Sequence, residues 1–173
     1  ALEDGARGPA SLVGRTETVL PSTAALVNGA ASHALDYDDV NFSMGGHPTV
    51  TVVPALLALG EQNRASGRLF IESFVAGYET SGRVGRLVAP SHYLECDQGF
   101  AASQSDHLNS DAALGTPPQG WHLRNNLFKY HAACYLTHAP IECAREIRLK
   151  SNFPPERVKK IMLRIDSGAD KVC

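Results

Sequence analysis

The chain has 173 residues, of which 43% are hydrophobic and 20% charged, and its formal net charge is −2. That length can bury one sizeable core or two small ones, and the charge gives no electrostatic reason to expect nucleic acid or an anionic membrane as a partner. No apolar run reaches the roughly 18 residues of a membrane-spanning helix, and the first residues lack the basic and then apolar pattern of a signal peptide.

The four cysteines include no CxxC pair. Two of them, Cys134 and Cys143, are nine residues apart. That spacing is about half a turn out of phase on a helix, so one helix could not direct both thiols at one metal. We therefore expect reduced thiols and a cytoplasmic location.

The first ninety residues predict a bundle of three helices and no sheet. Residues 1–20 are polar and rich in glycine, which indicates a loop or a short strand leading in. The sequence PST, whose hydroxyl groups can cap a helix, predicts a helix over residues 22–37. The spacing of apolar residues predicts two more helices, over residues 54–64 and 69–88.

The third predicted helix contains three glycines, Gly77, Gly82 and Gly85. Each glycine costs about 1 kcal/mol relative to alanine inside a helix, and a closely packed neighbour would explain them. Glu79 and Arg83 lie four residues apart on the same helix and predict an ion pair.

The second half of the chain has a different character. Residues 100–120 are polar, interrupted by proline and glycine, and without periodicity, which predicts a boundary without regular structure. A helix is predicted over residues 126–147, interrupted near Pro140. Strict alternation of isoleucine and leucine then predicts a half-buried strand over residues 160–166, outside the bundle.

Ionisable side chains crowd the end of the first predicted helix, where His33 and Asp36 share a face. Asp38 and Asp39 follow near its C-terminus, where the helix dipole disfavours negative charge, so a partner, a metal or a substrate is needed to explain them. His47 precedes a proline and is expected to be extended. A metal site made of His33, Asp36, Asp39 and His47 is an alternative that these residues leave open.

Five segments occur together in this chain: NGAASHALDYDD, an HP pair followed by an apolar helix ending in ALLALGE, GYETSGRVGR, FKYHAACYLTHAPIECA and PPERVKKIMLRI. In combination they resemble the MmgE/PrpD family, which includes 2-methylcitrate dehydratase, cis-aconitate decarboxylase and iminodisuccinate epimerase. The resemblance covers about residues 20–100 and 121–166.

The resemblance implies a mainly α fold, with a large helical domain and part of a smaller α+β lid domain. It implies a homodimer, an active site between domain and lid, and no metal or organic cofactor. The helical domain portion would be residues 1–105, a linker or chain discontinuity residues 106–124, and the start of the lid residues 125–173. The helical domain would be incomplete, because the family's pattern is interrupted after Phe100.

The resemblance also implies which residues form the site. The family's catalytic aspartate falls on Asp36, its loop histidine on His47 and its lid lysine on Lys129. A further lid position, which is histidine or cysteine in the family, falls on Cys134. Candidates for binding the substrate are Cys134, His33 and Asp39.

Loss of water from a hydroxy-carboxylate requires a base, an acid and cations for the substrate's carboxylates. We expect Asp36 and His47 to transfer protons and Lys129 to bind the anion. This predicts a cofactor-independent lyase for a small di- or tricarboxylate, with dehydration of a 2-methylcitrate-type acid favoured. The decarboxylase branch tends to carry threonine at the position of Val40 and a loop shorter by one residue, which disfavours decarboxylation. The open alternatives are a related epimerase, isomerase or decarboxylase, and a non-catalytic binding or assembly module.

Overall fold

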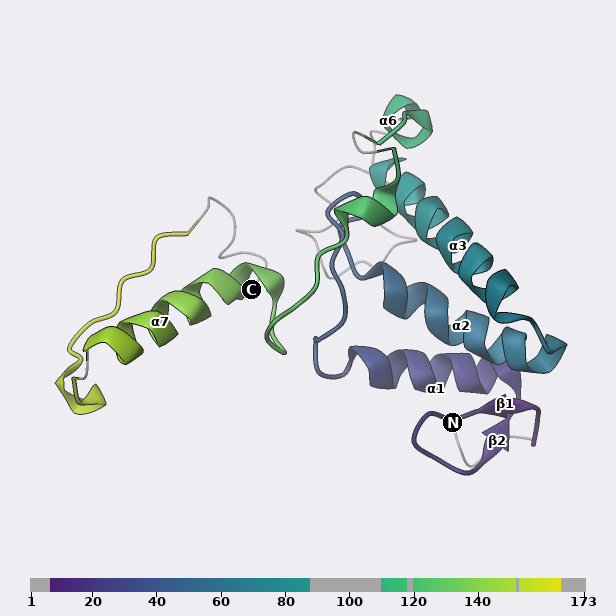
Figure 1. The fold of residues 1–173 in the computed structure, drawn as a ribbon, viewed down its shortest axis with the longest axis horizontal. Helices are drawn as coiled ribbons and strands as arrows, with labels where there is room; N and C mark the ends of the chain where they lie inside the picture. Colours follow the sequence, from purple (N-terminus) through teal and green to yellow (C-terminus); the bar gives the residue numbers. More distant parts are fainter. Residues whose placement is uncertain (1–6, 88–109, 118–119, 152, 166–173) are drawn as a thin grey trace.

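A computed structural model describes residues 7–87, 110–117, 120–151 and 153–165. Its main body consists of three helices, which are α1 (Pro21–His33), α2 (Pro48–Asn63) and α3 (Gly67–Leu87). Helix α1 packs against α2, and α2 packs against α3 (Figure 1). The fold is mainly helical, and the expectation of three packed helices near the start of the chain is confirmed.

The ends of these helices differ from the expected ones. Helix α1 ends at His33 rather than at residue 37, because the chain turns at Asp36, whose φ is +50°. Helix α2 begins at Pro48, six residues before the predicted start at Pro54. Proline is favoured in the first turn of a helix, so either Pro48 or Pro54 could mark the start of α2. In the structure the helix starts at Pro48, and Pro54 lies inside it.

A two-stranded antiparallel ladder precedes the bundle, with Ala10 of β1 (Ala10–Ser11) opposite Val19 of β2 (Thr18–Val19). The expectation that the first ninety residues contain no sheet is therefore wrong, although each strand has only two residues. The amide of Asn28 joins this hairpin to α1, because its Oδ1 accepts from Val13 N at 3.0 Å and its Nδ2 donates to Ser11 O at 3.0 Å. The buried apolar cluster beneath is small and consists of Ala10, Leu12, Val19, Ala24 and Ala58.

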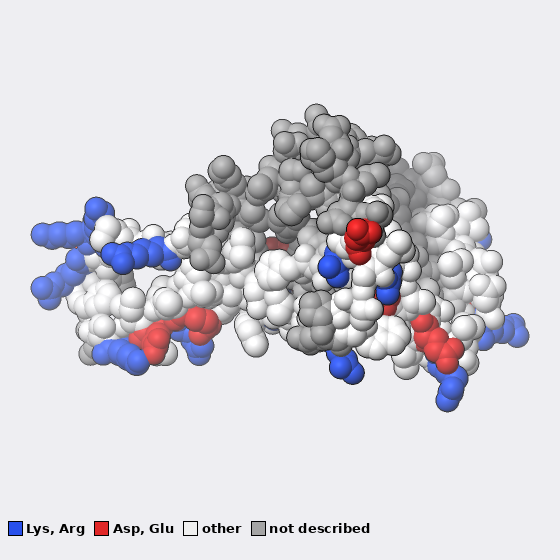
Figure 2. Space-filling model, turned by 90° about the horizontal axis from the view of Figure 1, so that it is seen from above, with Lys and Arg blue, Asp and Glu red and all other residues white. Residues whose placement is uncertain are grey.

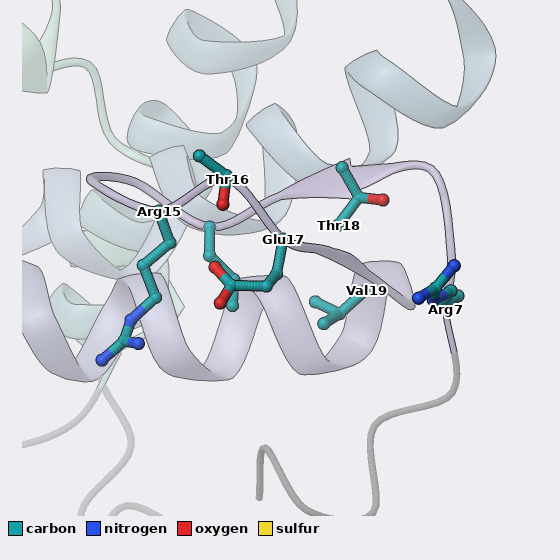
Figure 3. A pocket seen from close by; sticks show the side chains of 7 residues that line it. Arg7, Arg15, Thr16, Glu17, Thr18 and Val19 are labelled. Carbon is teal, nitrogen blue, oxygen red and sulfur yellow. The ribbon is translucent and has the colours of Figure 1, made fainter.

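A hollow of about 520 Å³ lies beside this hairpin. Its lining includes Arg7 and Arg15, which lie at opposite ends of it (Figure 3). It shares no residue with the site expected from the sequence. The hairpin packs against α1 and α2, so its contacts support the fold rather than the expected site.

Beyond the bundle the described elements are short until the last helix. Helix α6 (Ser110–Leu114) and the 3-10 turn η2 (His122–Asn125) pack on α3. They are followed by η3 (Tyr135–Thr137), α7 (His138–Ser151) and η4 (Pro155–Arg157). Helix α7 extends away from the bundle (Figure 1). Figure 2 shows Lys and Arg side chains at its outer end, where the last turn carries Arg148 and Lys150.

Three expectations for this half are corrected. Helix α6 lies inside the segment expected to lack regular structure, although residues 101–109 of that segment lie outside the described residues. The helix predicted over residues 126–147 begins only at His138, and Pro140 falls in its first turn, where no intrahelical N–H is required. Residues 158–165 form no strand, because an alternating sequence also needs a neighbouring strand to pair with.

Two glycines of α3 allow other segments to approach it closely. A Cβ at Gly85 would lie 2.2 Å from Met44 Cα, and a Cβ at Gly82 would lie 2.6 Å from the His122 ring. The predicted ion pair between Glu79 and Arg83 is absent from the described contacts. Glu79 instead accepts backbone hydrogen bonds from η2, and Arg83 donates to Ala113 O near the end of α6 at 3.0 Å.

Among the helices of the described ranges, none has both the length and the apolar character needed to cross a membrane.

Candidate active site

The loop between α1 and α2 is held in a fixed shape by the chain that enters the second half. Asp36 adopts a left-handed conformation and its N–H donates to His33 O at 2.9 Å, a turn that aspartate tolerates better than most residues. Val40 then pairs with Leu127 through two backbone hydrogen bonds of 2.9 and 2.8 Å. This pairing brings residues near 36 and 129 together.

The side chain of Lys129 is buried against Asp36. Its side chain is 0% exposed, and its Nζ donates to the backbone oxygen of Asp36 at 2.7 Å and to the Oδ1 atom of the same residue. The ammonium therefore compensates both the carboxylate and the carbonyl group of the strained turn. The structure brings together two of the three expected catalytic residues, although 93 positions separate them.

His47 is the N-cap residue of α2 and lies immediately before Pro48, with φ −112° and ψ 85°. Its Nδ1 lies 2.9 Å from the backbone oxygen of Asp39 and 3.3 Å from Oδ2 of Asp38. Both neighbours are acceptors while Asp38 is ionised, so Nδ1 must carry the proton in the neutral ring. The atom left for proton transfer is Nε2.

Asp38 is the residue that sequence reasoning left out of the site. Its carboxylate lies 2.9 and 3.1 Å from Nδ1 of His33, and the His33 and His47 rings are 4.9 Å apart. His33 therefore bonds Asp38, although helical spacing placed His33 on the same face as Asp36. The sequence did indicate that Asp38 needs a partner, because a carboxylate beside a helix C-terminus is unfavourable. It did not indicate that the partner is His33, because the helix ends before Asp36 and helical spacing does not apply beyond the turn.

The side chains of Asp39 and Cys134 do not take part in the contacts among His33, Asp38 and His47. Oδ1 of Asp39 accepts from Thr49 N at 3.1 Å, and its Oδ2 accepts from Thr49 Oγ1 at 2.5 Å. Asp39 thus caps the start of α2, and this structural role accounts for its burial. Cys134 is disulfide-bonded in the structure, which corrects the expectation of reduced thiols and removes its S–H as a hydrogen-bond donor. Cys143 is free and exposed.

A buried hydrogen-bond network fastens η2 to α3. Both carboxylate oxygens of Glu79 accept from consecutive backbone N–H groups, those of His122 at 3.1 Å and Leu123 at 2.9 Å. Tyr78 donates to Asn126 Oδ1 at 2.7 Å, and burial raises the pKa of Tyr78, which keeps its hydroxyl protonated. Asn41 donates to Tyr78 Oη and to His122 O, each at 2.9 Å. The network fixes the chain just before Lys129.

His33, Asp36, Asp38 and His47 each contribute one nitrogen or oxygen atom to a group in which all atoms lie within 4.8 Å of one another. Imidazole and carboxylate ligands suit several divalent metals, and Asp38 takes the place that the sequence gave to Asp39. In this arrangement, however, both Nδ1 atoms face a carboxylate as donors and the ammonium of Lys129 occupies Asp36. The same groups can also exchange protons with a substrate.

The model of a protein family described as the MmgE/PrpD N-terminal domain matches residues 1–108. Cis-aconitate decarboxylase of Mus musculus is 40% identical over 76 residues, which are 41% of this chain and 15% of the relative. Cis-aconitate decarboxylase of Homo sapiens is 38% identical over 76 residues, with shares of 41% and 16%. Cis-aconitate decarboxylase-like protein oryM of Aspergillus oryzae is 32% identical over 85 residues, with shares of 45% and 18%. The match spans less than a fifth of each relative's length.

Proposed function

Since the chain belongs to the MmgE/PrpD family, we propose that it is part of a lyase that acts on a small di- or tricarboxylate by acid–base chemistry without a cofactor. The convergence of Asp36, His47 and Lys129 carries the proposal. Asp36 and His47 come from the connection between α1 and α2 and lie in one group of ionisable atoms, which Lys129 joins from a distant segment through its ion pair with Asp36.

The chemistry needs two groups that can exchange protons with a substrate. A base must remove the proton next to a carboxylate, and an acid must assist the departing group. Oδ2 of Asp36 and Nε2 of His47 have no hydrogen bond to a described residue, and the two side chains are 40% and 21% exposed. Both can therefore meet a substrate that enters from solvent.

Lys129 supports the reaction through Asp36. Because its side chain is fully buried and bonded to Asp36, it has no free path to a substrate carboxylate in this arrangement. Its ammonium stabilises the charge of Asp36 and occupies Oδ1, which leaves Oδ2 for the reaction. We assign Lys129 this positioning role in place of the anion-binding role expected from the sequence.

Two reactions fit this set of groups. The length of the loop between Asp36 and His47 and the valine at position 40 disfavour decarboxylation by resemblance, which leaves loss of water from a 2-methylcitrate-type acid. The names of the relatives favour decarboxylation of a cis-aconitate-type acid. Both reactions generate negative charge next to a carboxylate, so the same residues serve either one.

An assay of the purified natural protein with 2-methylcitrate, citrate, cis-aconitate and iminodisuccinate decides between these reactions. Products are followed by proton NMR, and carbon dioxide release is measured separately. We expect turnover of at least one acid, and a fall in kcat of about 10²- to 10⁴-fold in His47→Gln and Asp36→Asn. Glu72→Gln is the matched control, because Glu72 is an exposed residue of α3 paired only with Arg68.

If the natural protein turns over none of these acids but binds one of them, the lyase proposal fails and a binding or assembly module remains. A homodimer and a cytoplasmic location belong to the same proposal. Light scattering and cell fractionation test them independently of the assay.

A further inference from the structure

Asp38 lies between two imidazole rings. Its side chain is 8% exposed, and its Oδ2 atom is 2.9 Å from Nδ1 of His33 and 3.3 Å from Nδ1 of His47. An ionised carboxylate only accepts hydrogen bonds. Both rings therefore present a protonated Nδ1 to the same oxygen, and both keep an unprotonated Nε2 when neutral.

We propose that Asp38 is a positioning residue that fixes His33 in the tautomer that the Asp39 carbonyl gives to His47, so that the site has two imidazole groups for proton transfer rather than one. This inference rests on the proposed lyase function. The two rings lie 4.9 Å apart and differ in exposure, since the side chain of His33 is 52% exposed and that of His47 is 21% exposed.

The difference in exposure gives the two rings different tasks. His47, which is deeper and held at the start of α2, transfers the proton at the substrate. His33 lies on the solvent side, where a second imidazole can exchange protons with water between turnovers. Each ring is useful only if Nε2 is the reactive atom, because Nδ1 of His33 is occupied by Asp38 and Nδ1 of His47 by the Asp39 carbonyl.

Asp38 and Asp39 form a natural pair for comparison. They are neighbours in the chain, and both carboxylates are largely buried. The carboxylate of Asp38 bonds histidine, whereas that of Asp39 bonds Thr49. A substitution that acts only through loss of a buried charge should therefore have the same effect at either position, whereas a tautomer effect should appear only at Asp38.

The tautomers can be measured directly by nitrogen-15 NMR of the imidazole rings in the natural protein, with His33→Gln used for assignment. We expect both rings to be protonated at Nδ1 when neutral. In Asp38→Ala, His33 should lose this tautomer, because the acceptor for its Nδ1–H is removed. His47 should keep it, since the Asp39 carbonyl remains, and Asp39→Ala should change neither ring.

The kinetic effect separates positioning from stability. We expect Asp38→Ala to lower kcat by about 10²-fold, the lower end of general acid–base contributions, with little change in KM and partial recovery in Asp38→Glu. Asp39→Ala should instead lower the melting temperature.

A ring protonated at Nε2 in the natural protein would overturn the inference, and this measurement does not require that any variant folds. An unchanged His33 tautomer in Asp38→Ala would overturn it as well. If the natural protein turns over no carboxylate, the lyase proposal fails, while the NMR result still decides the role of Asp38.

Discussion

Lys129 and Lys150 both pair with a carboxylate, but their surroundings are opposite. The side chain of Lys129 is fully buried against Asp36, whereas that of Lys150 is 73% exposed beside Glu146 on α7. A hydrogen-bonded group that is buried leaves unsatisfied partners when it is removed. An exposed pair is already solvated and contributes little.

This contrast gives a prediction for single side chains. Lys129→Met should lower the free energy of unfolding by about 1–3 kcal/mol, because the carbonyl and carboxylate of Asp36 lose their donor. Lys150→Met, the matched control, should change it by no more than about 0.5 kcal/mol. Urea unfolding measures both values. Equal effects of the two substitutions would show that the buried contact does not form.

At the scale of elements, α3 is the surface on which the site is assembled. Its glycines admit the α1–α2 loop at Met44 and the ring of His122, and its Tyr78 and Glu79 hold η2. The elements that carry the reactive groups are thus positioned by a helix that carries none of the catalytic residues proposed here.

Two glycines of α3 provide a test of this close packing. A Cβ at Gly85 would lie 2.2 Å from Met44 Cα, which is backbone and cannot move aside easily, whereas a Cβ at Gly67 would meet nothing within 4 Å. Gly85→Ala should therefore destabilise the protein by about 1–3 kcal/mol, despite better helix propensity. Gly67→Ala should stabilise it by about 0.4–1 kcal/mol. Thermal unfolding followed by circular dichroism distinguishes these results, and a stabilised Gly85→Ala would contradict the packing.

At the scale of the whole molecule, the bundle and the arm that carries α7 meet at η2. The His122 ring at this junction is fully buried, and neither of its nitrogens has a hydrogen-bond partner among the described residues. Burial lowers the pKa of His122 below its ordinary value of 6.5, an effect that Arg86 and Arg83 reinforce and Glu79 opposes.

The junction should therefore make stability depend on pH. Because His122 binds a proton more readily in the unfolded chain than in the folded one, the free energy of unfolding should fall as the pH drops through 6.5. His122→Leu should flatten this dependence between about pH 7 and pH 5, since it removes the group that takes up the proton. Urea midpoints measured across this range provide the check. The same slope in both proteins would exclude His122 as the cause.

Features that depend on a few neighbouring residues were determined by the sequence itself. A capping sequence and the spacing of apolar residues predicted three helices, because both signals are local properties. The five segments quoted above, which include the motif around Asp36 and the HP pair at His47, predicted the family in combination. The need for close approach at Gly82 and Gly85 was also readable, because glycine is costly in a helix unless something replaces its side chain.

Only the tertiary structure decided which groups meet. Asp38 and Asp39 are the same residue type in adjacent positions, and the turn at Asp36 determines that one bonds histidines and the other caps α2. Lys129 reaches Asp36 through the pairing of Val40 with Leu127, a contact that no local pattern encodes. The alternating residues 160–165 found no partner strand among the described residues. In each case the deciding contact joins groups whose relative placement depends on the folded backbone.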